Sequence, residues 1–435
     1  MQKKLLSGLF WVLLANLIVK PLWIFGIEVG VQNAVGNATY GFYFAVFNLA
    51  YIFNILLDVG ITNYNTRNIA QHPQLVGKYL GGILTAKIAL LGLYLLVAFS
   101  AGMALGYSSE EFHLLAWLCL AQFLNSLILY LRSNLEGLLL FKWDSLFSVL
   151  DRLLMIAICG CMLWTPLRVH FNIRWFVYAQ VAAYALTALT ALWVIARRTG
   201  RLRLRWNGLF TWAILKESAP FALLVLLMAS YNRIDPILLR HLAGAAEAGI
   251  YAGAFRLLDA LTMVAYLVSV PLLPVFSRIC SQKGNEAQRQ ELSGSISLVF
   301  WPMMVFAVGV SVAGAIWAEP LMELLYHGSG AAYVPVFRVV VFGIIPICIT
   351  YIFGTLLTAD GKLRLLNLLA ATSLLLNVVI NLLLIPRLGA AGSAWASLSA
   401  QSFMAIGQML LAIRLLHLPP SAFGLPRIKR YLRGQ

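Results

Sequence analysis

The chain has 435 residues, of which 61% are hydrophobic and 11% are charged, and its mean hydropathy is +0.84. Soluble domains carry roughly a quarter charged residues, so this balance excludes a soluble globular protein and indicates a polytopic membrane protein. The formal net charge of +16 does not indicate nucleic-acid binding, because the basic residues lie in short gaps between apolar runs and not on one soluble face.

Apolar runs of about 20 residues, the length that crosses a membrane, recur along the whole chain. They predict an all-α polytopic membrane protein with twelve transmembrane helices. The first run begins like a signal peptide, but no small-residue cleavage site precedes Lys20 and Pro21, so we interpret it as an uncleaved span. The predicted spans are 6–29, 40–61, 79–106, 112–131, 145–166, 175–196, 218–239, 248–277, 293–318, 333–357, 365–385 and 390–413.

Lysine and arginine in the connections predict the orientation, since they are enriched on the cytoplasmic side. With the N-terminus inside, the inner segments hold 22 of these residues, whereas the outer segments hold only Arg168, Arg174, Arg240 and Arg387. Both termini are therefore predicted to be cytoplasmic. The basic stretch RRTGRLRLRW, residues 197–206, becomes an inner linker that we expect to contact anionic lipid headgroups.

A weak internal repeat relates the two halves of the chain. GNATYGFYFAVFNL begins at Gly36 and GAAEAGIYAGAFRL begins at Gly244, and six of the fourteen positions are identical at an offset of 208. Each copy opens an even-numbered span after an outer loop, so both copies run in the same direction. We therefore predict two six-helix lobes related by a parallel pseudo-two-fold repeat. The expected parts are an N-terminal lobe at 1–196, a basic cytoplasmic linker at 197–217, a C-terminal lobe at 218–416 and a basic cytoplasmic tail at 417–435.

Six basic residues fall inside the predicted spans. Each would cost about 2.5 to 3.5 kcal/mol at the centre of a lipid-facing helix, so we expect them to face protein, water or a ligand. Only four acidic residues lie at comparable positions, Asp58, Asp151, Asp235 and Asp259, so ion pairing cannot neutralise all six. We predict a cationic cavity that binds a large anionic substrate and is lined by Lys20, Lys87, Arg152, Arg233, Arg256 and Arg338.

Structural ion pairing is the alternative interpretation of these charges. Arg256 and Asp259 are three residues apart, so they can pair along one helix face. Asp58, Asp151 and Asp259 are candidate carriers of a coupling proton or sodium ion, with a structural role beside an arginine as the alternative for each. We predict no cofactor, and the five cysteines have neither the spacing of a metal site nor that of a disulfide framework.

The stretch YNRIDPILLR, residues 231–240, places Arg233 and Asp235 directly before a proline inside an otherwise apolar span. Arginine suits phosphate because its planar fork binds two oxygens and keeps its charge when desolvated. Pro236 should interrupt the helix near Asn232 and expose backbone carbonyl groups. These features predict a phosphate-binding station on the seventh span.

Three stretches of the chain resemble one transporter family: GNATYGFYFAVFNLAYIFNILLDVGITNYNTRNIA at 36–70, AGIYAGAFRLLDALTMVAYLVSVPLLPVFSR at 248–278 and NVVINLLLIPRLGAAGSAWASLSAQ at 377–401. They are similar to bacterial polysaccharide or O-antigen flippases of the multidrug/oligosaccharidyl-lipid/polysaccharide exporter superfamily. The most specific parts are the G-x-Y start of spans two and eight and the IPRLGAAGSA turn.

The resemblance implies a V-shaped bundle of two lobes in the bacterial cytoplasmic (inner) membrane. It implies translocation of an undecaprenyl-diphosphate-linked oligosaccharide from the inner to the outer leaflet by alternating access. The implied partners are this substrate, membrane lipids and polysaccharide polymerase machinery, without nucleic acid. The resemblance supplies no substrate contacts for individual residues, so the candidate site rests on the charges within the spans.

Two other functions compete with this interpretation. A multidrug extruder of the same superfamily would need an acidic cleft for cationic drugs, whereas basic residues outnumber acidic ones here. A membrane-bound glycan polymerase or acyltransferase would need a catalytic constellation. The six histidines lie at loops or span ends without a His-Asp pair on one helix face, and no outer loop is long enough for a domain. We therefore expect a transporter and not an enzyme.

Overall fold

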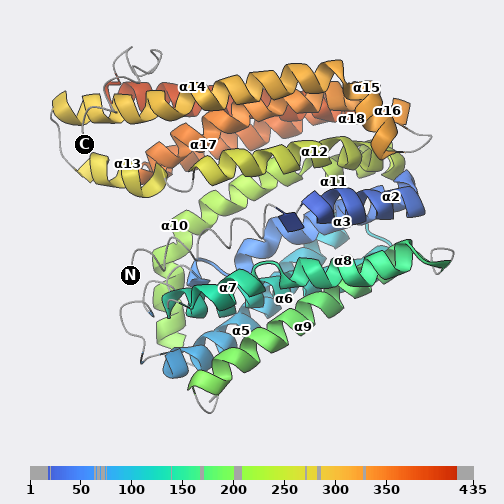
Figure 1. Ribbon diagram of the computed structural model, residues 1–435, viewed down its shortest axis with the longest axis horizontal. Coiled ribbons are helices and arrows are strands. Elements are labelled where there is room, and N and C mark those ends of the chain that lie inside the picture. Colours follow the sequence, from blue (N-terminus) through green and yellow to red (C-terminus); the bar gives the residue numbers. More distant parts are fainter. Residues whose placement is uncertain are drawn as a thin grey trace. The chain divides into compact units, whose positions relative to one another are not determined.

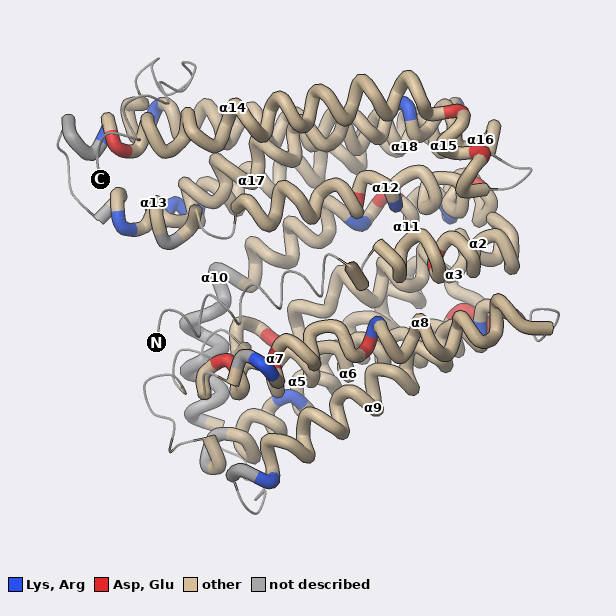
Figure 2. The backbone as a smooth tube through the Cα atoms, in the orientation of Figure 1, with Lys and Arg blue, Asp and Glu red and all other residues tan. Residues whose placement is uncertain are grey.

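The computed structural model describes residues 18–19, 21–62, 65, 69, 74, 76–138, 140–166, 171–199, 208–269, 272–281, 286–326 and 330–418. Its described part consists of helices joined by short turns, with no β-strand among those residues (Figure 1). Helices dominate because a backbone in hydrocarbon must satisfy its hydrogen bonds within the segment. Figure 2 shows these helices with few charged positions along most of their length.

The chain forms two compact units, Met1–Gly249 and Ile250–Gln435. In the first unit the helical segments are η1 (Leu22–Glu28), α2 (Val29–Val35), α3 (Asn37–Ile52), η2 (Phe53–Leu57), α5 (Val76–Ala104), α6 (Ser109–Gly137), α7 (Phe141–Phe147), α8 (Leu150–Leu163), α9 (Ile173–Thr199), α10 (Gly208–Arg233) and α11 (Asp235–Ala243). Within this unit α6 packs along α9, α3 packs on α6, and α10 and α11 both pack on α3. The bundle therefore brings the seventh predicted span against the second.

The second unit begins inside α12 (Ala245–Ser269), whose first residues belong to the first unit. It continues with α13 (Leu272–Ser281), α14 (Glu286–Ile316), α15 (Ala318–Leu325), α16 (Gly330–Val340), η5 (Val341–Gly343), α17 (Ile344–Ala359) and α18 (Leu363–Leu415). Helix α17 packs against α13, α14 and α18. The lobes predicted from the sequence, 1–196 and 218–416, have other boundaries than these two compact units, and they stay a prediction.

Nine of the helices in the described part of the chain are long and apolar enough to cross a membrane, or ten if α10 and α11 form one span. Helix α18 covers both predicted spans, 365–385 and 390–413, in one 53-residue helix. It kinks at Gly389, where φ is 55° and ψ is −132°, three residues after Pro386. A membrane protein with many helical spans is confirmed, whereas the total of twelve stays a prediction.

Several predicted spans are interrupted helices. The first contains the π-helical segment η1, which follows Pro21, and the second ends in the 3-10 segment η2. After η2 the backbone of Val59 and Gly60 has positive φ values of 42° and 84°, so the helix cannot continue there. Such breaks are tolerated in a membrane only where protein or water satisfies the freed backbone groups.

Candidate functional site: cationic residues of the spanning helices

Lys87 is held by the break in the second span. Its side chain is 1% exposed, and its Nζ lies 3.1 Å from Asp58 Oδ1. The same ammonium donates to the Leu57 carbonyl at 3.0 Å and to Ser126 Oγ at 2.8 Å. Ser126 Oγ also donates to the Leu57 carbonyl, at 3.2 Å. Lys87 therefore supplies the hydrogen bonds that the interrupted helix cannot make for itself.

Arg152 lies between aromatic rings from two other helices. Its guanidinium carbon is 5.2 Å from the ring of Trp23 on η1 and 5.8 Å from the ring of Tyr184 on α9. Its Nε is 3.5 Å from Asp151 Oδ2, and the side chain is 31% exposed. Glu28 contributes a further negative charge to its surroundings. Arg152 is thus oriented by ring faces and retains access to solvent or ligand.

Arg233 ends α10 directly before the bend in the seventh span. Helices α10 and α11 meet at an angle of 41°, and Pro236 lies in the first turn of α11. The break was expected, since a proline provides no backbone N–H for the preceding turn. The Arg233 guanidinium carbon lies 5.4 Å from the ring of Tyr51 on α3, and Tyr51 is 38% exposed. A planar cation stacked on an accessible ring is suited to bind a phosphate or a sugar.

Arg256 lies inside the second unit and is buried. Its Nη1 donates to the Tyr326 hydroxyl at 2.9 Å, and that hydroxyl donates to the Gly253 carbonyl at 3.2 Å. Tyr326 stacks on Tyr333 with the ring centroids 4.1 Å apart. This arrangement joins α12 to the α15–α16 region of the same unit, so Arg256 has a packing role in addition to any role toward substrate.

The remaining predicted site residues are Lys20, Arg338 and Asp259. Lys20 falls outside the described residues. Arg338 is exposed on α16. Asp259 is half-buried on α12, where its carbonyl accepts from Thr262 Oγ1. The structure therefore joins Lys87 with Asp58 and Arg152 with Asp151, while the assignment of all six bases to one cavity stays a prediction.

An ion pair between Arg240 and Glu111 was not expected from the sequence, in which Arg240 counted only as an outer connection residue. It joins the last turn of α11 to the first turn of α6. The Arg240 guanidinium also lies 5.5 Å from the Phe42 ring and 5.1 Å from the Tyr107 ring. The available signal was Ser108 three residues before Glu111, a capping-box spacing that predicts where α6 begins.

Tyr107 remains neutral beside Arg240. It lies in the turn between α5 and α6, and burial raises the pKa of its hydroxyl to about 12, although Arg240 acts in the opposite direction. Tyr107 therefore offers Arg240 a ring face and no negative charge at neutral pH. The charge of Arg240 is balanced by Glu111.

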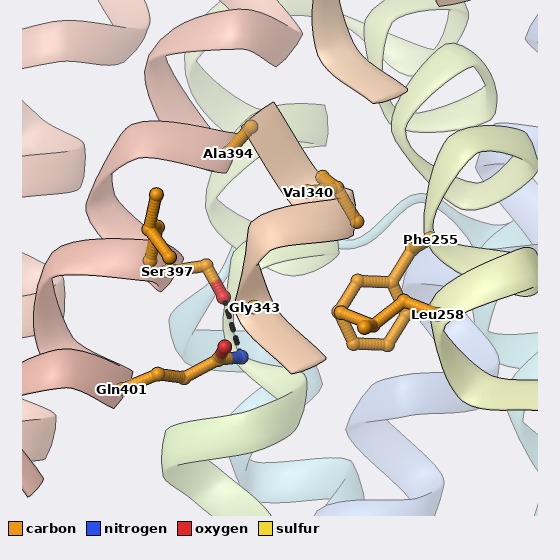
Figure 3. Close-up of a pocket in the computed structure, with 8 residues that line it drawn as sticks. Phe255, Leu258, Val340, Gly343, Ala394, Ser397 and Gln401 are labelled. Atoms are coloured by element: carbon orange, nitrogen blue, oxygen red, sulfur yellow. Dashed lines mark hydrogen bonds between the residues drawn. The ribbon is translucent and has the colours of Figure 1, made fainter. Parts of the chain in front are cut away.

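A small recess in the second unit is lined by residues of α12, α16, η5 and α18 (Figure 3). Its empty volume is ≈ 160 Å³. Gln401 and Ser397 point toward it and are joined by a hydrogen bond of 3.2 Å from Gln401 Nε2 to Ser397 Oγ. The volume of ≈ 160 Å³ includes open solvent, and the space enclosed between the side chains is ≈ 0 Å³, so the recess cannot hold a lipid-linked glycan.

Long apolar helices with broken spans, together with arginines that lie over aromatic rings, define a multi-pass membrane protein. The chain matches the polysaccharide biosynthesis protein family over residues 5–280 and the lipid II flippase MurJ family over residues 145–425. The chain therefore belongs to the polysaccharide biosynthesis protein family, and the lipid II flippase MurJ family model also matches more than half of it.

Known proteins with this fold include both flippases and drug transporters. An uncharacterized membrane protein of Methanocaldococcus jannaschii is 20% identical over 442 residues, covering 95% of this chain and 85% of that protein. A lipid II flippase MurJ in an inward closed conformation superposes with a TM-score of 0.68 at 14% identity, covering 97% of this chain and 90% of the other. An inward-facing multidrug resistance MATE transporter gives 0.66 at 16% identity, covering 94% and 95%. These structural likenesses establish the fold.

Proposed function

We propose that this protein moves an undecaprenyl-diphosphate-linked oligosaccharide, such as an O-antigen repeat unit, from the inner to the outer leaflet of a bacterial inner membrane. The observation that carries the proposal is the stack of Arg233 on the accessible ring of Tyr51, at the break of the seventh span. A guanidinium binds two oxygens of a diphosphate at once, and an aromatic face packs against a sugar ring. Arg233 and Tyr51 together therefore offer a contact to the diphosphate and a contact to a sugar of this substrate.

Arg152 supports the same substrate class from a second position. Its guanidinium lies against the faces of Trp23 and Tyr184. Arginine held flat by rings loses less freedom when it binds an anion, because the side chain is already oriented. A guanidinium binds an anion and repels a cationic drug, the substrate of the competing drug-transport function, although Asp151 and Glu28 offset the charge of Arg152. The only support for drug transport is the similarity of the fold to that of a multidrug resistance MATE transporter.

The test is a flipping assay in sealed vesicles that contain the purified protein and a fluorescent polyprenyl-diphosphate oligosaccharide. We expect Arg233→Ala to reduce the flipping rate at least about tenfold, which corresponds to 1.4 kcal/mol. Arg233→Lys should recover only part of the rate, since lysine has no planar fork. Arg278→Ala is the matched control, because Arg278 is an exposed arginine paired with Glu291 at 3.1 Å. Wild-type rates in Arg233→Ala, or transport of cationic dyes with no lipid flipping, would refute the proposal.

Coupling to an ion gradient is a further part of the proposal. Asp58 and Asp151 both lie beside basic residues, at 3.1 Å and 3.5 Å. A carboxylate that exchanges a basic partner for a proton or sodium ion could link ion binding to helix movement. We propose that one of Asp58, Asp151 and Asp259 is this carrier.

A further inference from the structure

The first residues of the second repeat copy, 244–249, meet the first copy within the first unit. Gly36 and Gly244 are 208 positions apart, and both have a backbone conformation that favours glycine, with φ and ψ of 80° and 165° at Gly36 and of 96° and 169° at Gly244. Each of these residues immediately precedes a helix, α3 or α12. The same local chain reversal is therefore used at both repeat positions.

The contact between the two copies is reciprocal. A Cβ atom on Gly41 would overlap the Ala245 carbonyl oxygen, and a Cβ atom on Gly249 would overlap the Asn37 carbonyl oxygen. Residues 37 and 245 are repeat equivalents, and so are residues 41 and 249. Gly41 of the first copy thus contacts residue 245 of the second copy, and Gly249 of the second copy contacts the equivalent residue 37 of the first copy. This exchange of equivalent contacts is the pattern of an interface with two-fold symmetry.

Polar contacts surround this glycine crossing. Gln32 Nε2, on α2, donates to the Gly249 carbonyl at 2.8 Å in a buried hydrogen bond. On the neighbouring face, Arg240 of α11 pairs with Glu111 of α6. Figure 1 shows α11 beside α3, in agreement with their packing contacts. Helix α11 and the start of α12 are therefore held on α2, α3 and α6 by backbone and ionic contacts, beside the buried apolar side chains of Ile237, Leu239 and Ala248.

The polar contacts at this crossing can be exchanged for hydrogen bonds to water. Water replaces the hydrogen bonds of the Arg240–Glu111 pair when it opens, and the desolvation penalty of the buried pair is then released. Gly41 and Gly249 have no side chain, so the two helices can separate at these positions without a change of side-chain rotamer. Helix α11 is also jointed to α10 by the 41° bend beside Pro236, which provides a hinge. These are the properties of a contact that opens and closes.

We propose that the crossing of Gly41 and Gly249, with the Arg240–Glu111 pair, is a latch that closes the outer end of the transport path and opens to release substrate. The sequence places the α11–α12 turn outside, and the transport role of the latch rests on the proposed function. Opening moves α11 and the start of α12 away from α3 and α6, while α6 keeps its contact with α9.

The experiment measures the movement itself, independently of any substrate. Spin labels are placed at Glu110→Cys on α6 and His241→Cys on α11, both exposed positions, and their distance is measured by electron paramagnetic resonance. The full chain is used, with the five native cysteines replaced by serine or alanine. The control pair is Glu110→Cys with Arg174→Cys, which joins α6 to α9 across an exposed ion pair of 2.7 Å.

We expect two distance populations for the test pair and one for the control pair. Arg240→Gln should shift the test populations toward the longer distance by about fivefold or more, while the control distance stays unchanged. Gly41→Ala should act in the same direction, because its methyl group opposes closure. A single test distance that neither Arg240→Gln nor Gly41→Ala moves would refute the latch. If the distances shift as expected and the protein flips no lipid-linked oligosaccharide, the latch stands and the proposed function fails.

Discussion

Lys87 donates to the backbone carbonyl of Leu57 at 3.0 Å while its ammonium lies 3.1 Å from the carboxylate of the next residue, Asp58. One buried cation thus satisfies both a helix end and the side chain that follows it. We therefore expect Lys87→Met to destabilise the protein by roughly 3 kcal/mol, because Asp58, which is only 24% exposed, loses its cationic partner and keeps only neutral donors such as Thr62. The unfolding midpoint in detergent measures this effect.

The double variant Lys87→Met, Asp58→Asn separates a structural pair from a substrate contact. We expect it to recover much of the lost stability, since neither charge is left alone. If Lys87 instead served only substrate, the single variant would keep its unfolding midpoint and lose flipping. Lys142→Met, at an exposed position on α7, provides a control for the loss of a lysine.

Arg256 should affect stability through Tyr326. Arg256→Ala removes the donor to the Tyr326 hydroxyl and opens a gap in a buried region, so we expect a loss of about 2 to 3 kcal/mol. Tyr326→Phe should cost only about 1 kcal/mol, because the ring stack on Tyr333 remains. Thermal unfolding distinguishes the two. An unchanged midpoint in Arg256→Ala, combined with lost flipping, would instead assign Arg256 to substrate.

Ion coupling predicts a different pattern. Neutralising the carrier among Asp58, Asp151 and Asp259 should abolish the response of flipping to an imposed proton or sodium gradient, with folded protein still in the membrane. The measurement is flipping rate in vesicles with and without each gradient, for the three Asp→Asn variants. Unchanged gradient dependence in all three would place coupling at other residues or remove it from the mechanism.

The orientation is tested by reporter fusions. The excess of lysine and arginine in the inner segments predicts that a fusion after residue 206 reports a cytoplasmic location. Fusions at residues 170 and 327 should report the opposite side. A cytoplasmic signal at residue 170 or 327 would contradict the twelve-span topology.

The class of protein could be predicted from the sequence, because length and hydropathy of a span are set by the membrane and not by neighbouring residues. Local chain breaks could also be predicted, because they depend on the chemistry of single residues and not on distant neighbours. Pro236 has no backbone N–H whatever its surroundings, and the bend between α10 and α11 lies beside it. The repeat of Gly36 and Gly244 was visible in the sequence, and both residues have the positive φ that favours glycine.

The partners of the charged residues were decided by tertiary structure. Lys87 lies 29 positions from Asp58, and Arg240 lies 129 positions from Glu111, so no helix periodicity relates the members of either pair. A charge inside a span must find a partner because desolvation is costly, and sequence alone indicates that need. Which partner it finds depends on how the helices cross, and the crossing depends on small packing differences such as the missing side chains of Gly41 and Gly249.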